Sequence, residues 1–106
     1  MYYTLFRVNG EVEQVSNGKR PDREDIHKWL STDDFEFASY GLKWGDKDMS
    51  VKLIWRDNTG MYDPPNENIT NAMNSSKNKR NKQYVKFWGG FNIKGDVVVE
   101  SHQRLI

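Results

Sequence analysis

The sequence contains no cysteine among its 106 residues. Disulfide bonds, thiol nucleophiles and cysteine-ligated zinc or iron are therefore excluded, and the absence is typical of proteins from a reducing compartment. No apolar run approaches the roughly 20 residues that a membrane-spanning helix needs. The first ten residues also lack the basic and then apolar pattern of a secretion signal. These absences predict a soluble protein of the cytoplasm without a membrane partner.

Catalytic and metal-binding motifs are equally scarce. His27 and His102 are the only imidazoles, and no spacing typical of a zinc or calcium site is present. The sequence also lacks a nucleophile elbow and a phosphate-binding P-loop. A serine, a histidine and an acid brought together only by folding remain compatible with the sequence. We expect no cofactor, no metal and no catalytic residue, and interpret the protein as non-enzymatic.

The length and composition predict one domain covering residues 1–106. Hydrophobic residues make up 36% of the chain, and four Trp, five Tyr and five Phe add large apolar side chains to a modest aliphatic content. Because a buried aromatic side chain removes roughly 150–250 Å² from water, one core is feasible. The chain is too short to divide into two domains.

The first half of the chain predicts a hairpin and a short helix. Asn9 and Gly10 favour a two-residue turn between two strands within residues 1–16, and this turn would pair Leu5 with Gln14. Asp22 is a typical N-cap for a helix beginning near residue 23. Spacings of three and four residues then predict one buried stripe on that helix, formed by Ile26, Trp29 and Leu30.

Alternating hydrophobicity predicts a second strand pair at residues 35–44 and 49–56. In the first of these strands the apolar residues change parity, since Phe35 and Phe37 lie on one face whereas Tyr40, Leu42 and Trp44 lie on the other. A bulge near Ala38 and Ser39 would reconcile the two halves. A further turn is expected over residues 56–60.

The second half predicts another capped helix and further strands. Asn66 is the expected cap of a helix whose buried stripe is Ile69, Ala72 and Met73. Residues 74–83 favour a solvated loop or a frayed helix end, and residues 84–91 favour a strand, although a helical turn also fits them. Residues 97–99 predict an interior strand. The expected fold is α+β, with an antiparallel or mixed sheet of about five to six strands and two short helices on one face.

Two segments carry a resemblance to a known family. Asn66 and Thr70, within Pro64-Pro65-Asn66-Glu67-Asn68-Ile69-Thr70, and the ending Gly95-Asp96-Val97-Val98-Val99 resemble the C-terminal half of small proteins of unknown function encoded mainly by bacteriophages and mobile elements. The resemblance covers about the last forty residues, and the basic segment 77–82 is an insertion relative to its pattern. It implies a phage origin and a role in binding a host component, such as a defence protein or its nucleotide signal, in the host cytoplasm.

Positive charge is concentrated near the end of the chain. Residues 1–76 contain nine Lys or Arg against thirteen Asp or Glu, whereas residues 77–106 contain seven against two. Such segregation indicates a binding surface. Aromatic residues that could stack on a partner, Phe87 and Phe91 among them, lie close to the cations. We select as candidate binding residues Lys77, Lys79, Arg80, Lys82, Tyr84, Lys86 and Trp88.

Three partners fit these residues. An acidic surface on a host protein is the main hypothesis, so that the protein would inhibit or sequester its partner. Nucleic acid bound by residues 77–86 is the second, because the cations could neutralise several phosphates. A small phosphorylated signal is the third, held in a pocket that Trp44, Trp55 and Arg56 would line. A mobile charged loop without a partner also remains compatible with the sequence.

Overall fold

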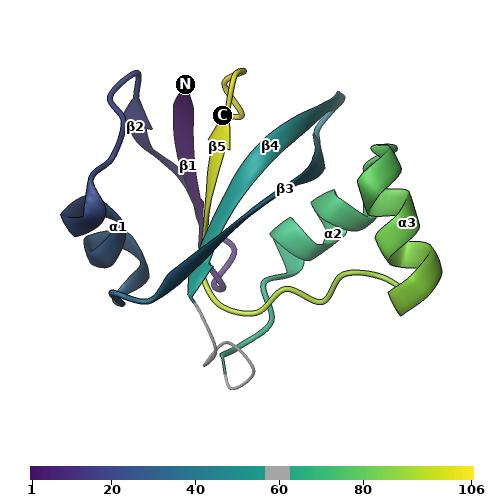
Figure 1. Cartoon of the computed structure of the whole chain (residues 1–106). Helices are drawn as coiled ribbons and strands as arrows, with labels where there is room; N and C mark the ends of the chain where they lie inside the picture. The colour runs from purple at the N-terminus through teal and green to yellow at the C-terminus, as the bar shows by residue number, and fades with distance from the viewer. Residues whose placement is uncertain (57–62) are drawn as a thin grey trace.

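The computed structural model describes residues 1–56 and 63–106, which form five strands and three helices (Figure 1). In chain order these are β1 (Tyr2–Phe6), β2 (Val12–Asn17), α1 (Arg23–Leu30), β3 (Phe35–Trp44), β4 (Lys47–Arg56), α2 (Glu67–Ser75), α3 (Lys79–Trp88) and β5 (Val97–Ser101). The turn expected over residues 56–60 lies almost wholly outside the described residues.

The strands form one antiparallel sheet in the order β2-β1-β5-β4-β3. The last strand, β5, is inserted between β1 and β4. Its residues Val97, Val98 and Val99 are almost completely buried, as expected for a strand covered on both faces. The prediction of an interior strand at residues 97–99 is therefore confirmed.

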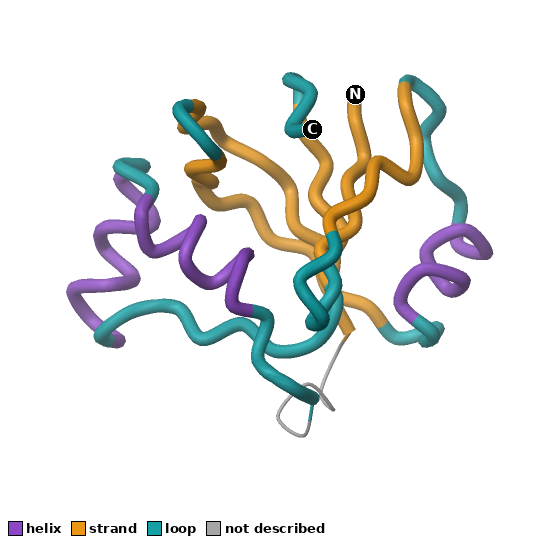
Figure 2. The backbone as a smooth tube through the Cα atoms, turned by 180° about the vertical axis from the view of Figure 1, so that it is seen from behind, coloured by secondary structure: helices purple, strands orange, loops and turns teal. Residues whose placement is uncertain are grey.

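Helices cover both faces of this sheet, as Figures 1 and 2 show from opposite sides. On one face, Ile26 and Leu30 of α1 pack against the sheet; on the other, Ile69 and Met73 of α2 do so. The α+β class is confirmed. The arrangement expected from the sequence differs in detail, because the described residues contain three helices rather than two and α1 lies on the face opposite to α2 and α3.

The two covered faces also explain the change of parity in β3. The pairing of β3 with β4 is regular from Phe35 opposite Arg56 to Trp44 opposite Lys47. The bulge expected near Ala38 is therefore wrong. Phe35 packs on the α1 side of the sheet, whereas Tyr40 and Leu42 pack on the α2 side. The strand changes the face that it buries because different helices cover its two ends.

Between its loop and Thr4, the first hairpin has a register one residue away from the predicted one, whereas beyond an irregularity between Tyr3 and Thr4 it has the predicted register, with Tyr3 opposite Ser16. Arg7 and Glu11 close a three-residue loop, in which the Arg7 amide donates to Glu11 at 2.9 Å and Gly10 has a φ of +93°. Leu5 therefore lies opposite Glu13 instead of Gln14, and Phe6 lies opposite Val12. Since a shift of one residue exchanges the faces of a strand, Phe6 and Val12 now share the α2 side of the sheet.

Residues 79–88 form a helix where the sequence favoured a loop and then a strand. Asn78 caps its start by accepting a hydrogen bond from the Arg80 amide at 2.9 Å, and Gly89 ends it in the left-handed conformation with a φ of +80°. The strand favoured over residues 84–91 is therefore wrong, and the helical turn that the sequence left open as the alternative is found at Tyr84 to Trp88. Tyr84 and Val85 are helical because tertiary contacts of Asn81 and Tyr84 hold the helix in place.

Candidate functional site

The start of α3 is fixed by a carboxylate from the β3–β4 hairpin. Asp48 accepts hydrogen bonds from the Ser76 hydroxyl at 2.6 Å and from the Lys77 amide at 2.8 Å. Burial by itself raises the pKa of Asp48, but these two hydrogen bonds and the nearby Lys43 and Lys77 outweigh it and leave the pKa below its ordinary value. The α2–α3 junction is thus tied to the sheet by a charged acceptor.

The middle of α3 is fixed by a buried amide. The Asn81 side chain is fully buried, accepts from the Gly41 amide at 2.6 Å and donates to the carbonyls of Gly41 at 2.8 Å and Met73 at 2.9 Å. Gly41 carries no side chain, and a Cβ there would collide with Ser76 and Asn78. Asn81 therefore pairs with the edge strand β3 as a neighbouring strand would.

The exposed side chains of α3 include three lysines and, at the C-terminal end of the helix, two aromatic rings. Lys79, Lys82 and Lys86 follow one another at spacings of three and four residues and are all exposed. Phe87 and Trp88 are 76% and 75% exposed. Trp88 follows Tyr84 by one turn, with the two ring centroids 6.4 Å apart, and so lies on another side of the helix than the lysines. Together these five residues form what we call the α3 surface. The exposure of Phe87 follows from its position in the helix. In a strand, the same side chain could have pointed to either face of the sheet.

The remaining candidate residues are placed differently. The Arg80 guanidinium lies over the Tyr40 ring at 4.7 Å, so part of its role is to cover the core. Tyr84 is half-buried and stacks on Phe91 with the ring centroids 4.1 Å apart. The Lys77 side chain is exposed just before the helix begins. Phe91, named as a stacking residue from the sequence, is buried.

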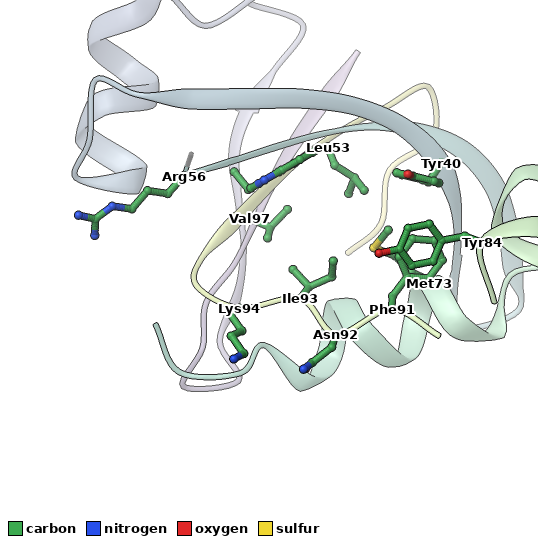
Figure 3. Close-up of a pocket in the computed structure, with 11 residues that line it drawn as sticks. Tyr40, Leu53, Arg56, Met73, Tyr84, Phe91, Asn92, Ile93, Lys94 and Val97 are labelled. Atoms are coloured by element: carbon green, nitrogen blue, oxygen red, sulfur yellow. The ribbon is translucent and has the colours of Figure 1, made fainter. Parts of the chain in front are cut away.

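A cleft of about 530 Å³ opens on the inner side of α3 (Figure 3). It lies between the face of the sheet and the segment that connects α3 to β5. Its described lining is mostly aromatic and aliphatic, and consists of Tyr40, Leu53, Trp55, Arg56, Met73, Tyr84, Phe91, Asn92, Ile93, Lys94 and Val97.

Two of the three residues predicted to line a nucleotide pocket are at this cleft. Trp55 and Arg56 line it, whereas Trp44 does not. Trp44 instead packs edge-on against Phe6, with the ring centroids 5.0 Å apart. The difference arises because Trp44 and Trp55, although on one face of the sheet, belong to opposite ends of the long β3–β4 hairpin.

The residues that carried the family resemblance form a structural junction. The buried Asn66 amide donates to the carbonyls of Phe6 and Gly95, both at 2.9 Å, and Thr70 accepts from the Ile93 amide at 2.9 Å. Asp96 accepts from the Val8 amide at 2.9 Å. These contacts join the start of α2 to the first hairpin and to β5, and they account for these polar residues without a ligand.

The histidine and carboxylate side chains of the described residues form no second candidate site. His27 is paired with Asp33 on the surface at 2.8 Å. Within residues 1–56 and 63–106, no group of three or more His, Asp or Glu side chains is placed to hold a metal ion. None of the helices in the same residues is long and apolar enough to cross a membrane.

Comparison with known proteins gives no relative. The chain matches no protein-family model, no curated protein and no solved structure.

Proposed function

We propose that this protein is a non-enzymatic binding protein that attaches to an acidic surface of a host protein through the α3 surface. The observation that carries the proposal is the exposure of Phe87 and Trp88 on the same short helix as three exposed lysines. A small protein gains no folding free energy from rings that stay in water, whereas aromatic residues commonly dominate the energy of protein interfaces.

The way in which α3 is held supports a role in binding. Asp48 fixes the start of the helix and Asn81 fixes its middle, while Tyr84 stacks on the core. The outer residues are therefore presented on a rigid support, which lowers the entropy that a partner must remove when it binds. A loop kept soluble by its lysines, the alternative left open by the sequence, would not require such contacts.

The charges define the chemistry of the partner. No acidic residue occurs between Lys77 and Gly95, so α3 has no acid of its own to neutralise its lysines. Exposed lysines and aromatic rings on one short helix fit a partner surface that offers acidic side chains next to an apolar patch. The resemblance of residues 66–70 and 95–99 to phage proteins supports a bacterial host component as that partner, which the protein would inhibit or sequester.

The test compares two variants with matched controls. Purified protein is used to capture partners from a bacterial lysate, and the enriched protein is identified by mass spectrometry, purified and titrated. F87Q/W88Q and K79Q/K82Q/K86Q keep residues compatible with a helix and are each expected to weaken binding at least tenfold. The controls are Phe37→Gln, an exposed aromatic residue on β3, and K19Q/R20Q/K28Q, which removes the same charge elsewhere.

Nucleic acid is distinguished by nuclease treatment and by salt. A protein partner should survive nuclease, whereas binding to duplex DNA through three lysines would fall by roughly 2.7 units of log K per tenfold rise in salt. Equal binding by the α3 variants and their controls would contradict the proposal. Capture that disappears with nuclease would replace the protein partner with nucleic acid.

A further inference from the structure

We propose that the cleft on the inner side of α3 is a second binding site, which holds a planar aromatic anion such as a nucleoside monophosphate. The proposal stands apart from the function proposed for the α3 surface. Lys79, Lys82 and Lys86 point away from the fold, and the cleft takes only Tyr84 from α3.

The size and walls of the cleft suit a flat apolar body. Its volume of about 530 Å³ falls within the roughly 300–1,000 Å³ of small-molecule sites. Leu53, Met73 and Val97 supply aliphatic surface from the sheet and α2. A planar ring system would gain apolar contact on these walls and exclude water from them.

Aromatic side chains are concentrated at one end of the cleft. Tyr40 contacts Phe91 edge-on at 5.0 Å, and Tyr84 stacks on Phe91 at 4.1 Å. Figure 3 shows the three residues gathered beside Met73. Their mutual contacts keep the rings in fixed positions, so this end offers a preformed aromatic wall. Trp55, which is half-buried, adds a fourth aromatic side chain to the lining.

Cationic residues lie at the other end. Arg56 and Lys94 line the cleft together with the Asn92 amide, and none of its described lining residues is acidic. The Arg56 guanidinium is 3.9 Å from the Asp63 carboxylate, and a guanidinium, with its five N–H donors, can bind a second anion beside the first. Figure 3 shows Arg56 extending outward at the end of the cleft away from Tyr84.

The separation of aromatic and cationic lining residues indicates which class of ligand the cleft would bind. A ligand whose ring lies toward Tyr40 and Phe91 would place its anionic group toward Arg56 and Lys94. Phosphate and carboxylate both match an arginine, since each accepts two parallel N–H bonds. Because Arg56 is partly exposed, the anion would remain close to water and its binding would weaken as salt rises.

The experiment titrates the ¹⁵N-labelled full chain with four probes followed by amide NMR. These are AMP, adenosine, inorganic phosphate and 1-naphthoate, which separate the contributions of the ring, the phosphate and a carboxylate. We expect AMP to bind saturably and at least tenfold more tightly than adenosine or phosphate, with the largest shifts at the lining residues 91–94 and 53–56. Tighter binding of 1-naphthoate than of AMP would make the site one for aromatic carboxylates.

Two variants complete the test. R56Q/K94Q is expected to weaken AMP binding at least tenfold, whereas the charge-matched control K19Q/K28Q should leave it unchanged. F87Q and K79Q/K82Q/K86Q should also leave it unchanged, since none of these residues lines the cleft, which separates this proposal from the one for the α3 surface. Absence of saturable binding of all four probes to the wild-type protein, or shifts confined to Lys79, Lys82 and Lys86, would overturn the proposal.

Discussion

Single polar residues determine where the elements of this protein are attached. Asn66 and Asn81 are both fully buried, and each side chain makes three hydrogen bonds, two of which link segments far apart in the sequence. A buried amide without partners would cost free energy, so these side chains are favourable only in the native arrangement. They specify this arrangement more than they add to the net stability.

Replacing Asn81 tests this role at the scale of one residue. Asn81→Ala leaves the amide and carbonyl of Gly41 without their partner, and we expect the free energy of unfolding to fall by about 2–3 kcal/mol. Gln83→Ala, an exposed substitution in the same helix, should change it by less than about 0.5 kcal/mol. Urea denaturation followed by circular dichroism measures both. Equal effects would show that Asn81 does not hold the helix to β3.

At the scale of the element, α3 is a helix that buries little apolar surface against the fold. Asn81 is its only fully buried residue, and most of the others face water. Short isolated helices are unstable in water, because nucleation is costly and few hydrogen bonds repay it. The helix therefore depends on its cap at Asn78, on the contacts of Asn81 and Tyr84, and on the attachment of its start to Asp48.

The attachment at Asp48 should make the stability of the α3 region depend on acid. The pKa of Asp48 is lowered in the folded protein, despite burial that by itself would raise it, because Ser76 and the Lys77 amide donate to the carboxylate. The folded state thus binds this proton less readily than the unfolded state, whose carboxyl has a pKa of about 3.9. The stabilisation is fully present above that value and is lost as the pH falls through the lower folded pKa.

Asp48→Asn removes this contribution. At pH 7 we expect the variant to be less stable than the wild type by roughly 0.5–1 kcal/mol, since the carboxylate is exposed and its charge is screened by solvent, with amide hydrogen exchange faster at Lys77 and through α3. The difference should shrink when both proteins are measured near pH 3. Asp46→Asn, in the turn of the same hairpin, is the control and should show neither effect. A difference that persists unchanged at low pH would contradict the role assigned to the Asp48 carboxylate.

At the scale of the whole molecule, two apolar clusters share one sheet. The cluster under α1 contains Leu5, Ile54 and Val98, whereas the cluster under α2 contains their strand neighbours Phe6, Leu53 and Val97. Because adjacent residues of the same strands build both clusters, neither cluster can be lost while the other keeps its strands intact. The two sides of the molecule should therefore unfold together.

Two truncations in opposite clusters test this coupling. Leu30→Ala on α1 and Met73→Ala on α2 remove buried side chains, and each should lower the free energy of unfolding by about 2–5 kcal/mol. Urea titration followed by amide NMR should give one midpoint for residues of α1, α2 and β5 in each variant. If Leu30→Ala lowers the midpoint of α1 alone, the two clusters are independent.

The sequence by itself determined those features that local chemistry controls. Asp22 caps α1 with a complete capping box, and Asn66 caps α2, as short polar acceptors do wherever a helix begins. The stripe of Ile69, Ala72 and Met73 is buried as its spacing predicts. The basic composition of residues 77–86 also marked the region of the candidate surface, since the charge of a segment is set by its composition and not by its fold.

Only the tertiary structure decided the features that depend on distant residues. Residues 79–88 became a helix because Gly41 and Met73 provide partners for Asn81, which no local pattern contains. The face buried by each half of β3 follows from which helix lies over it. The cleft likewise needs Tyr40, Trp55 and Phe91 from three separate segments. In each case the free energy that selects the structure comes from contacts between residues distant in the sequence. Sequence patterns indicate only the local conformational preferences of residues that are neighbours along the chain.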